Sequence, residues 1–296
     1  MTWHWPVLRS TGPVLGVDAG GTGTRAVLLV DGTPTQTFTS GPVNYLLHSD
    51  GPERLAALIR QAGAPTAGVG VPGIARQPGA TQSLARELSI ASGARVRVAP
   101  DATVAWLGAF LGAPGIVVIA GTGSVAVGGS GKRLSRVGGH GYLIGDQGGG
   151  YWIGKRGLRA ALAAAEGSGP PTMLTQAIPE AAGCTLDDLV TRVHRDPRDR
   201  AILASLAPVV ARCGSGAHRD LVAGEIVVAA AVALAGLAQA LQRRLRDGGI
   251  CDSDLPVAGA GGVFSMPWLR EEFCRRTGGR APLAPPEVGA ALLACC

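Results

Sequence analysis

Two apolar segments of this chain each end in a loop of glycine with threonine or serine, and a second apolar segment follows each loop at once. The first loop, residues 18–24, reads Asp-Ala-Gly-Gly-Thr-Gly-Thr, and the second, residues 121–124, reads Gly-Thr-Gly-Ser. The loops lie about 100 residues apart, a spacing that indicates an internal duplication. A strand, a tight turn and another strand in each half therefore predict two similar domains that face each other across a cleft.

The first half of the chain alternates between strand patterns and helix patterns. Strands are expected over residues 14–17, 26–30, 33–39, 67–71 and 95–99, and helices over residues 52–62, 81–90 and 103–111. Three strands in succession, followed by strands that alternate with helices, predict a mixed sheet covered by helices. The fold class expected for the chain is therefore α/β.

The second half restarts this pattern with two strands and is then mainly helical. The strands are expected over residues 115–120 and 125–128, and the helices over residues 150–165, 186–193, 200–213, 221–247, 267–277 and 287–296. The predicted domains are residues 1–112 together with 286–296, and residues 113–285, which are richer in helix.

Composition and charge exclude several classes of function. The 296 residues are 46% hydrophobic, which is too high for a disordered chain. The net charge of +6 comes from scattered arginines without a basic block, so we expect no nucleic-acid partner. The most apolar helical stretch, Val227 to Ala238, is shorter than the roughly 20 residues of a bilayer span, and no targeting signal is visible. We therefore expect a cytoplasmic protein without membrane contact.

Three common motifs are absent or fortuitous. The six cysteines contain no C-x-x-C pair, so zinc and iron–sulfur sites are not expected. Gly131-Lys132 is followed by Arg133 and does not form a P-loop. Residues 68–73 match G-x-G-x-x-G, but Pro72 and the polar stretch after it do not open a helix, so we treat this match as chance.

The first glycine loop has the composition of an anion-binding turn. Gly20, Gly21 and Gly23 let consecutive backbone N–H groups turn inward, and Thr22 adds a hydroxyl donor. Asp18, at the strand end beside this nest, would repel a phosphate unless a divalent cation lay between them, so it predicts bound Mg²⁺. An ordinary glycine-rich hairpin turn is the alternative. The second loop repeats the pattern, and two such nests suit a polyphosphate held between two domains.

Four segments of the chain resemble the motifs of one superfamily, in the same order. Residues 18–24, 121–124 and 257–264 resemble the phosphate-1, phosphate-2 and adenosine motifs of the sugar kinase/hsp70/actin superfamily. Residues 139–153 are similar to a stretch of N-acetylglucosamine kinases and of the related BadF/BadG/BcrA/BcrD ATPase family. The resemblance implies two ribonuclease-H-like (actin-like ATPase) domains, with ATP bound in the cleft between them.

The resemblance also implies roles for individual residues. Asp101 lies where the family has its general base, which accepts the proton of the sugar 6-hydroxyl as that oxygen attacks the γ-phosphate. A helix N-cap is an alternative and compatible role of this residue. Asp18 is the expected Mg²⁺ ligand. ATP is expected to contact Asp18, Gly20, Gly21, Thr22, Gly23, Thr122, Gly123, Ser124, Gly261 and Gly262.

The sugar is expected to contact residues from several parts of the chain. By the same resemblance these are Asn44, Tyr45, Asp101, Thr122, Gly141 and Asp146. An Asx turn is the alternative role of Asn44, and a cap on the helix that begins near Gly149 is the alternative role of Asp146. One position departs from the family pattern. Val125 stands where amino-sugar kinases of this kind have an asparagine that contacts the sugar.

The leading interpretation is an ATP-dependent kinase that phosphorylates the 6-hydroxyl of N-acetylglucosamine or glucosamine, with a homodimer implied by the resemblance. One alternative is a sugar-responsive sensor without catalysis, although only about a dozen residues precede the first expected strand, too few for a helix-turn-helix. Another is an ATP-driven activator of a 2-hydroxyacyl-CoA dehydratase. Such activators hold an iron–sulfur cluster just beyond the second phosphate loop, and no cysteine occurs between Gly121 and Gly183.

Overall fold

The computed structural model describes residues 12–20, 23–43, 49–131, 133–195, 200–216 and 219–295. The chain divides into two compact units, Met1–Gly115 with Pro282–Cys296 (unit 1) and Ile116–Ala281 (unit 2). The domain boundaries expected from the sequence, 112/113 and 285/286, lie a few residues from these. The cleft expected between two domains stays a prediction.

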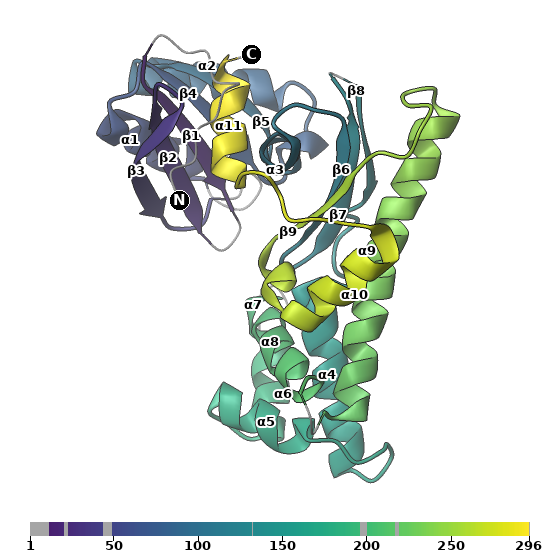
Figure 1. Ribbon diagram of the computed structural model, residues 1–296. Helices are drawn as coiled ribbons and strands as arrows, with labels where there is room; N and C mark the ends of the chain where they lie inside the picture. Colours follow the sequence, from purple (N-terminus) through teal and green to yellow (C-terminus); the bar gives the residue numbers. More distant parts are fainter. Residues whose placement is uncertain are drawn as a thin grey trace. The chain divides into compact units, whose positions relative to one another are not determined.

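Unit 1 contains a five-stranded mixed sheet (Figure 1). Its strands are β1 (Val14–Ala19), β2 (Thr24–Val30), β3 (Thr33–Ser40), β4 (Thr66–Val71) and β5 (Arg95–Pro100), in the spatial order β3-β2-β1-β4-β5. The first three strands form an antiparallel meander, whereas β4 runs parallel to both β1 and β5. The carboxyl ends of β1, β4 and β5 therefore lie at one edge of the sheet.

Helices cover both faces of this sheet, and alternate residues of β1 face the two layers. The helices are α1 (Gly51–Ala62), α2 (Ala80–Ser92), α3 (Asp101–Phe110) and α11 (Pro286–Cys295), with a 3₁₀ turn, η1, at Ile74–Arg76. Leu15 and Val17 are buried with residues of α1 and α2, whereas Val14 is buried with residues of α11. This alternation is the period of two that a strand requires.

The C-terminal helix α11 lies directly on glycines of the sheet. A Cβ atom on Gly16 of β1 would collide with the carbonyl oxygen of Glu287, and one on Gly68 of β4 would collide with that of Ala290. On its other side, a Cβ atom on Gly289 of α11 would collide with the carbonyl oxygen of Val104 in α3. The backbones of four elements thus approach more closely than any side chain at these positions would permit.

Unit 2 contains a four-stranded sheet in the order β8-β7-β6-β9. The strands are β6 (Gly115–Ala120), β7 (Ser124–Ser130), β8 (Arg133–Gly138) and β9 (Val257–Ala260). β8 pairs antiparallel with β7, and β9 pairs parallel with β6. β8 and β9 are strands that the sequence analysis did not predict. The order nevertheless matches that of β3, β2, β1 and β4 in unit 1, as a duplication requires.

The rest of unit 2 is helical, as expected. Its helices are α4 (Gly150–Ala165), α5 (Leu174–Ala182), α6 (Leu186–Arg195), α7 (Arg200–Ser205), α8 (Ala207–Cys213), α9 (Leu221–Asp247), η2 (Gly262–Ser265) and α10 (Pro267–Thr277). The sequence analysis missed α5 and was wrong to predict one helix over 200–213. The structure breaks that segment at Leu206, because Pro208 has no N–H to bond to Ala204 and starts a new helix instead.

Helix α9 is 27 residues long and is fixed at its start by a buried carboxylate. Asp220 Oδ1 accepts the Ala223 N–H at 2.7 Å, and Oδ2 accepts the Met173 N–H at the start of α5 at 2.6 Å. Among the described residues, α9 is the one helix that is long and apolar enough to cross a membrane. It extends well beyond the stretch from Val227 to Ala238 that the sequence analysis judged too short for a bilayer span. Half of its most apolar window is buried, which a core helix also shows.

We predict that Gly68→Ala destabilises unit 1. The added methyl group meets a backbone carbonyl that cannot rotate away, so α11 must shift, at a cost of about 1–3 kcal/mol in the free energy of unfolding. Urea denaturation followed by circular dichroism measures the change. Gly12→Ala, which places the same methyl group in open space just before β1, is the control, and an unchanged midpoint for Gly68→Ala would contradict the close packing.

Candidate active site

Two predicted carboxylates lie at the same edge of the unit 1 sheet. Asp18 is the fifth residue of β1 and pairs in register with Gly70 of β4, which in turn pairs with Ala99 of β5. Asp101 follows β5 directly as the first residue of α3. Both carboxylates therefore belong to the carboxyl ends of parallel strands, with one strand between them. In open α/β sheets this edge is where ligands bind.

The surroundings of Asp18 disfavour its ionised form. Burial, followed by the negative charges of Asp101 and Glu287, raises the pKa of Asp18 to about 7. Arg25, directly opposite on β2, acts in the other direction but does not outweigh them. Glu287 lies in the first turn of α11 and was not singled out in the sequence. Only the packing of α11 onto β1 brings Glu287 near Asp18.

Asp101 is held by the start of its own helix. Its Oδ1 accepts the Ala102 N–H at 2.8 Å. The helix N-cap is Pro100, so the alternative role of Asp101 as the N-cap is wrong, and its carboxylate lies within the first helical turn. This bond restricts the orientation of the carboxyl group at the sheet edge.

The first glycine loop closes on itself between β1 and β2. The Gly20 N–H donates to the Gly23 carbonyl at 2.9 Å, and the Val43 N–H donates to the Gly20 carbonyl at 3.1 Å. Gly20 and Gly23 thus form a closed turn after Asp18, and their contact with ATP stays a prediction. Four other predicted residues, Gly21, Thr22, Asn44 and Tyr45, lie outside the described residues.

In unit 2, the second glycine loop packs against the start of α4. The N–H groups of Gly150 and Tyr151 donate to the carbonyls of Gly121 and Thr122, at 2.7 and 3.0 Å. The loop also closes on itself, because the Gly121 N–H donates to the Gly123 carbonyl at 3.0 Å. The helix start therefore fixes the loop that was predicted to bind phosphate.

Asp146 lies against this second loop. Its carboxylate occupies the space that a Cβ atom on Gly123 would need, and its Oδ1 accepts the Gly141 N–H at 3.3 Å. The side chain is 8% exposed, and the residue has a positive φ of 60°. The cap of α4 is Gly149, with no side-chain bond, so the alternative role of Asp146 as the cap is wrong. Gly123, Gly141 and Asp146 are thus brought together, as a common role requires.

The adenosine motif lies at the edge of the unit 2 sheet where β6 leads into the second glycine loop. β9 runs parallel to β6, with Ala260 opposite Ile119, so both strands end together. A Cβ atom on Gly261 would lie 2.5 Å from the Ala120 carbonyl oxygen. Gly261 and Gly262 therefore adjoin the loop that contains Thr122, Gly123 and Ser124. These residues belong to unit 2, whereas Asp18 and Asp101 belong to unit 1. That the two sets form one site stays a prediction.

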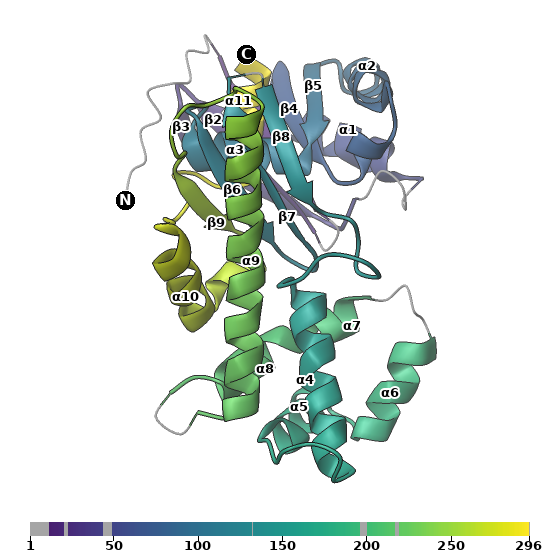
Figure 2. The same cartoon turned by 90° about the vertical axis from the view of Figure 1, so that its right-hand side faces the viewer.

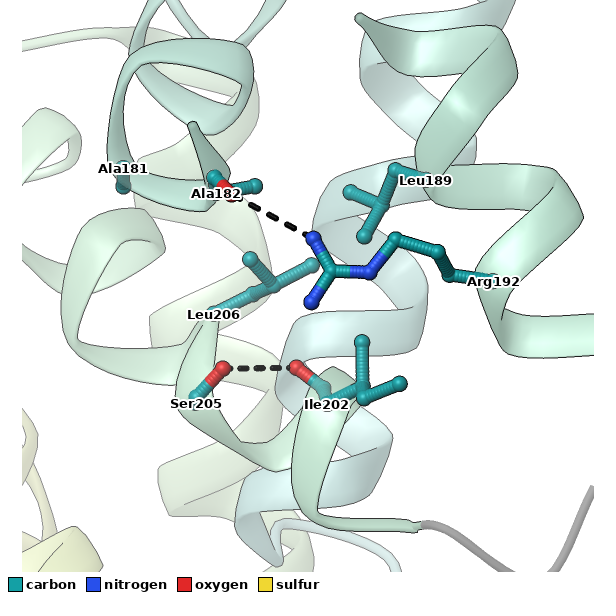
Figure 3. A pocket seen from close by; sticks show the side chains of 7 residues that line it. All are labelled: Ala181, Ala182, Leu189, Arg192, Ile202, Ser205 and Leu206. Carbon is teal, nitrogen blue, oxygen red and sulfur yellow. Dashed lines mark hydrogen bonds between the residues drawn. The ribbon is translucent and has the colours of Figure 1, made fainter. Parts of the chain in front are cut away.

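A cavity of about 250 Å³ lies elsewhere in unit 2, among helices α5, α6 and α7 (Figure 3). Arg192 Nη1 donates to the Ala182 carbonyl at 3.4 Å, and Ser205 Oγ donates to the Ile202 carbonyl at 2.7 Å. The lining residues are Ala181, Ala182, Leu189, Arg192, Ile202, Ser205 and Leu206. None of them is a predicted site residue, so this cavity is not the site that the sequence indicates.

The family is decided by a match over almost the whole chain. The model of the BadF/BadG/BcrA/BcrD ATPases matches residues 15–294, which include both glycine loops and α11. The chain belongs to the BadF/BadG/BcrA/BcrD ATPase family. The resemblance found in the sequence is thereby confirmed.

Two relatives of this BadF/BadG-type chain are named as sugar kinases. It is 36% identical over 118 residues to the N-acetylmuramic acid/N-acetylglucosamine kinase of Clostridium acetobutylicum, which is 39% of each protein. It is also 36% identical over 137 residues to the N-acetyl-D-glucosamine kinase of Dictyostelium discoideum, which is 44% of this chain and 41% of that one. The chain therefore matches less than half the length of these relatives.

Solved structures extend the similarity over the complete fold. A proposed N-acetylglucosamine kinase from Chromobacterium violaceum has a TM-score of 0.75 at 29% identity, with 95% of this chain and 98% of that chain covered. A ROK family glucokinase from Streptomyces griseus, solved with glucose and AMPPNP, has a TM-score of 0.59 at 19% identity, with 96% and 98% covered. The predicted α/β fold of actin-like ATPases is confirmed.

Among the described residues, no group of three or more histidine, cysteine, aspartate or glutamate side chains could hold a metal ion by itself. Mg²⁺ does not require such a group, because it keeps several waters and commonly binds one or two carboxylates together with substrate phosphates. Asp18 fits this role in the family member described here. It is a buried carboxylate beside two further acids, and a bound cation would favour its ionised form against the burial and the negative charges that raise its pKa.

We predict that Asp18→Asn stabilises the protein in the absence of Mg²⁺, and does so more at pH 8 than at pH 5. The folded-state pKa of about 7 lies above the ordinary value of 3.8, so the folded state keeps a proton that the unfolded state has lost. Stability therefore falls as the pH rises from about 4 to 7. Asparagine removes this penalty, which at pH 8 is worth at most about 4 kcal/mol.

Urea denaturation at both pH values, in EDTA, measures this difference. Asp31→Asn is the matched control, because Asp31 is exposed in the turn between β2 and β3, at the opposite edge of the sheet. A gain for Asp18→Asn that is equal at the two pH values would contradict the raised pKa.

Proposed function

We propose that this family member is an ATP-dependent sugar kinase that phosphorylates the 6-hydroxyl of an amino sugar, either N-acetylglucosamine or glucosamine. The observation that carries the proposal is the position of Asp101 at the same sheet edge as Asp18, with its carboxylate bonded to the first turn of α3. In this arrangement Asp18 binds the cation and Asp101 accepts the proton. The names of the relatives from C. acetobutylicum and D. discoideum support this class of acceptor.

In this proposal Asp101 is the general base. Its carboxylate accepts the proton of the 6-hydroxyl while that oxygen forms a bond to the γ-phosphorus in line with the leaving β-phosphate oxygen. The bond between the γ-phosphorus and the β-phosphate oxygen breaks, and ADP leaves. The hydrogen bond from Ala102 to Oδ1 keeps the carboxyl group oriented during this transfer.

The glycine loops hold the nucleotide. In unit 1, Gly21, Thr22 and Gly23 supply backbone and hydroxyl donors for phosphate oxygens, and in unit 2 Thr122 and Gly123 do the same. Gly20 and Ser124 shape the two loops, because the Gly20 N–H donates to the Gly23 carbonyl at 2.9 Å and Ser124 Oγ donates to the Gln147 carbonyl at 2.7 Å. Gly261 and Gly262 leave bare backbone for the adenosine. Asp18 holds the Mg²⁺, which supplies neutralisation of the charge on the phosphates when it is bound.

The acceptor is bound by Asn44, Tyr45, Thr122, Gly141 and Asp146, together with Asp101. The support for Asp146 is its burial against Gly123 and its bond to Gly141, which fix a carboxylate beside the second loop. Val125 supplies no hydrogen bond where an asparagine is expected, so the 2-substituent of the sugar is recognised by other groups. We further propose that the protein acts in the cytoplasm as a homodimer, without nucleic-acid or membrane partners.

We predict that a screen of ADP release will identify the acceptor. Purified protein with ATP and Mg²⁺ is tested against N-acetylglucosamine, glucosamine, N-acetylmuramic acid, N-acetylmannosamine and glucose. The expected result is turnover with an amino sugar and little ATPase activity without sugar, because binding of the acceptor positions the hydroxyl and excludes water.

Two results of this screen would contradict the proposal. Sugar binding without ADP release would make the protein a sensor. ATP hydrolysis that no sugar changes would indicate an ATPase of another kind, such as a dehydratase activator.

We predict that Asp101→Asn lowers kcat by roughly 10²–10⁴-fold, the usual contribution of a general base, while sugar affinity is largely kept. Asparagine retains the size of the side chain and its oxygen, so the bond from Ala102 survives. Steady-state kinetics and calorimetric sugar titration separate the two effects, and Asp31→Asn again serves as the control. Near-normal turnover of Asp101→Asn would show that Asp101 is not the base.

A further inference from the structure

The cavity among helices α5, α6 and α7 combines aliphatic walls with one cationic group (Figure 3). Leu189, Ile202 and Leu206 supply the larger aliphatic side chains, and Ala181 and Ala182 complete the apolar surface. The volume of about 250 Å³ is smaller than the roughly 300–1,000 Å³ of pockets for drug-sized ligands. The cavity therefore suits a molecule of a few carbon atoms.

Arg192 extends into this cavity with hydrogen-bond donors that are not used. Among the described residues only its Nη1 has partners, the Ala182 carbonyl at 3.4 Å and Cys184 Sγ at 3.5 Å. No ion pair of Arg192 occurs within the part of the chain that the structure describes. Asp188, one turn earlier on α6, accepts the Thr185 hydroxyl at 2.8 Å instead. The guanidinium is thus available to an anion from solution.

The lining decides which kind of anion fits. Ser205 Oγ already donates to the Ile202 carbonyl at 2.7 Å, so Arg192 is the side chain of the lining that can donate to a ligand. A guanidinium offers two parallel N–H groups, which match the two oxygens of a carboxylate. Inorganic phosphate would leave the aliphatic walls without contacts, whereas a short branched hydrocarbon would cover them. The chemistry therefore favours a small aliphatic carboxylate.

Helix α7 connects this cavity to the second glycine loop. Ile202 and Ser205 line the cavity, whereas the carbonyl group of Leu203 lies on α4, where a Cβ atom on Gly154 would collide with it. α7 therefore lies directly on the first turns of α4 (Figure 2). The start of α4 in turn donates hydrogen bonds to the carbonyls of residues 121 and 122 in the second glycine loop. A molecule that holds α7 in place also restrains this loop.

A second contact of α7 reaches the segment that contains Asp146. The Arg200 guanidinium lies 5.0 Å from the centroid of the Tyr142 ring, and that ring packs edge-on against Tyr151 of α4, with 5.0 Å between the centroids. Tyr142 follows Gly141, whose N–H donates to Asp146 Oδ1. α7 is thus in contact with both segments of unit 2 to which ligand binding is assigned in the proposed function.

We propose that the cavity is an effector site for a small aliphatic carboxylate, and that its occupant acts on nucleotide binding through α7. The occupant contacts α5, α6 and α7 together, so it restrains α7 against α4. A loop that is ordered in advance loses less freedom when the nucleotide binds, so the occupant is expected to increase nucleotide affinity. The carboxylate site stands by itself, whereas the coupling rests on the proposed function of the second glycine loop.

Titration of the full chain with three probes, followed by ligand-observed NMR, tests the site. Isovalerate is the aliphatic carboxylate, isovaleramide is its uncharged counterpart of the same shape, and inorganic phosphate is an anion without an apolar part. Isovalerate is expected to bind with a Kd about tenfold or more below those of the other two, since a hydrogen bond to a charged group is lost in one case and the apolar contacts in the other.

Variants separate the cavity from the surface around it. Arg192→Gln removes the charge and is expected to raise the Kd of isovalerate about tenfold or more. Arg195→Gln removes the same charge from an exposed position of α6 outside the lining, and is expected to leave this Kd unchanged. Ala181→Leu fills the cavity from α5 and is expected to prevent binding with an unchanged circular dichroism spectrum, since leucine favours a helix.

Nucleotide titrations test the coupling. The Kd of AMPPNP with Mg²⁺ is expected to fall about threefold or more in saturating isovalerate, and AMPPNP is expected to lower the Kd of isovalerate by the same factor, because linkage is reciprocal. Arg192→Gln is expected to abolish this effect while the affinity for AMPPNP without isovalerate is kept.

Four results would contradict the inference in different parts. Equal binding of isovaleramide, phosphate binding as tight as that of isovalerate, or isovalerate binding that Arg192→Gln leaves unchanged would each overturn the carboxylate site. An AMPPNP affinity that saturating isovalerate does not change would overturn the effector role. A protein that binds isovalerate through Arg192 but does not bind AMPPNP contradicts the proposed function, and the effector role with it, while the carboxylate site stands.

Discussion

Contact between bare backbones is the constraint on which unit 1 depends. Strands β1 and β4 have no side chain at Gly16 and Gly68, so the carbonyl groups of α11 lie directly on the sheet. The same helix has a glycine, Gly289, where it meets α3. Close packing of this kind leaves no freedom to slide, because every shift brings a carbonyl oxygen against a neighbouring backbone atom. These contacts therefore determine where α11 lies on the sheet.

This packing determines the electrostatics at the carboxyl edge of the sheet. Because α11 begins beside β1, its first turn adds Glu287 to the surroundings of Asp18, which already include Asp101. Burial first, and then the charges of these two acids, disfavour the ionised form of Asp18. An ionised Asp18 lowers the stability of unit 1 when no cation is bound. The same surroundings favour binding of a cation together with an anionic nucleotide. At Asp18, the ionised form that the proposed cation binding needs is also the form that lowers the stability of unit 1.

Local patterns predicted most of the elements, and long-range contacts account for what they missed. The β-branched runs and glycine loops gave β1, β2, β3, β6 and β7, and the limits of α4, α9 and α10 agree with the expected ranges. β8 is short, has no fully buried residue and contains the exposed Arg133 and Arg136, so it has no apolar alternation to reveal it. α5 contains Pro179, which argues against a helix locally. Glu287 has no local signal at all, since its proximity to Asp18 arises only in the folded sheet.

The path of the chain through unit 1 has a consequence for synthesis on the ribosome. Unit 2 is continuous in sequence, from Ile116 to Ala281, whereas unit 1 needs the segment from Pro282 onwards. Until α11 emerges, Gly16 of β1 and Gly68 of β4 lack the helix that covers them, although their strands are made before unit 2. Unit 1 is thus completed only after unit 2 has been made, and the nascent chain must keep a partly open sheet face from aggregating while unit 2 folds.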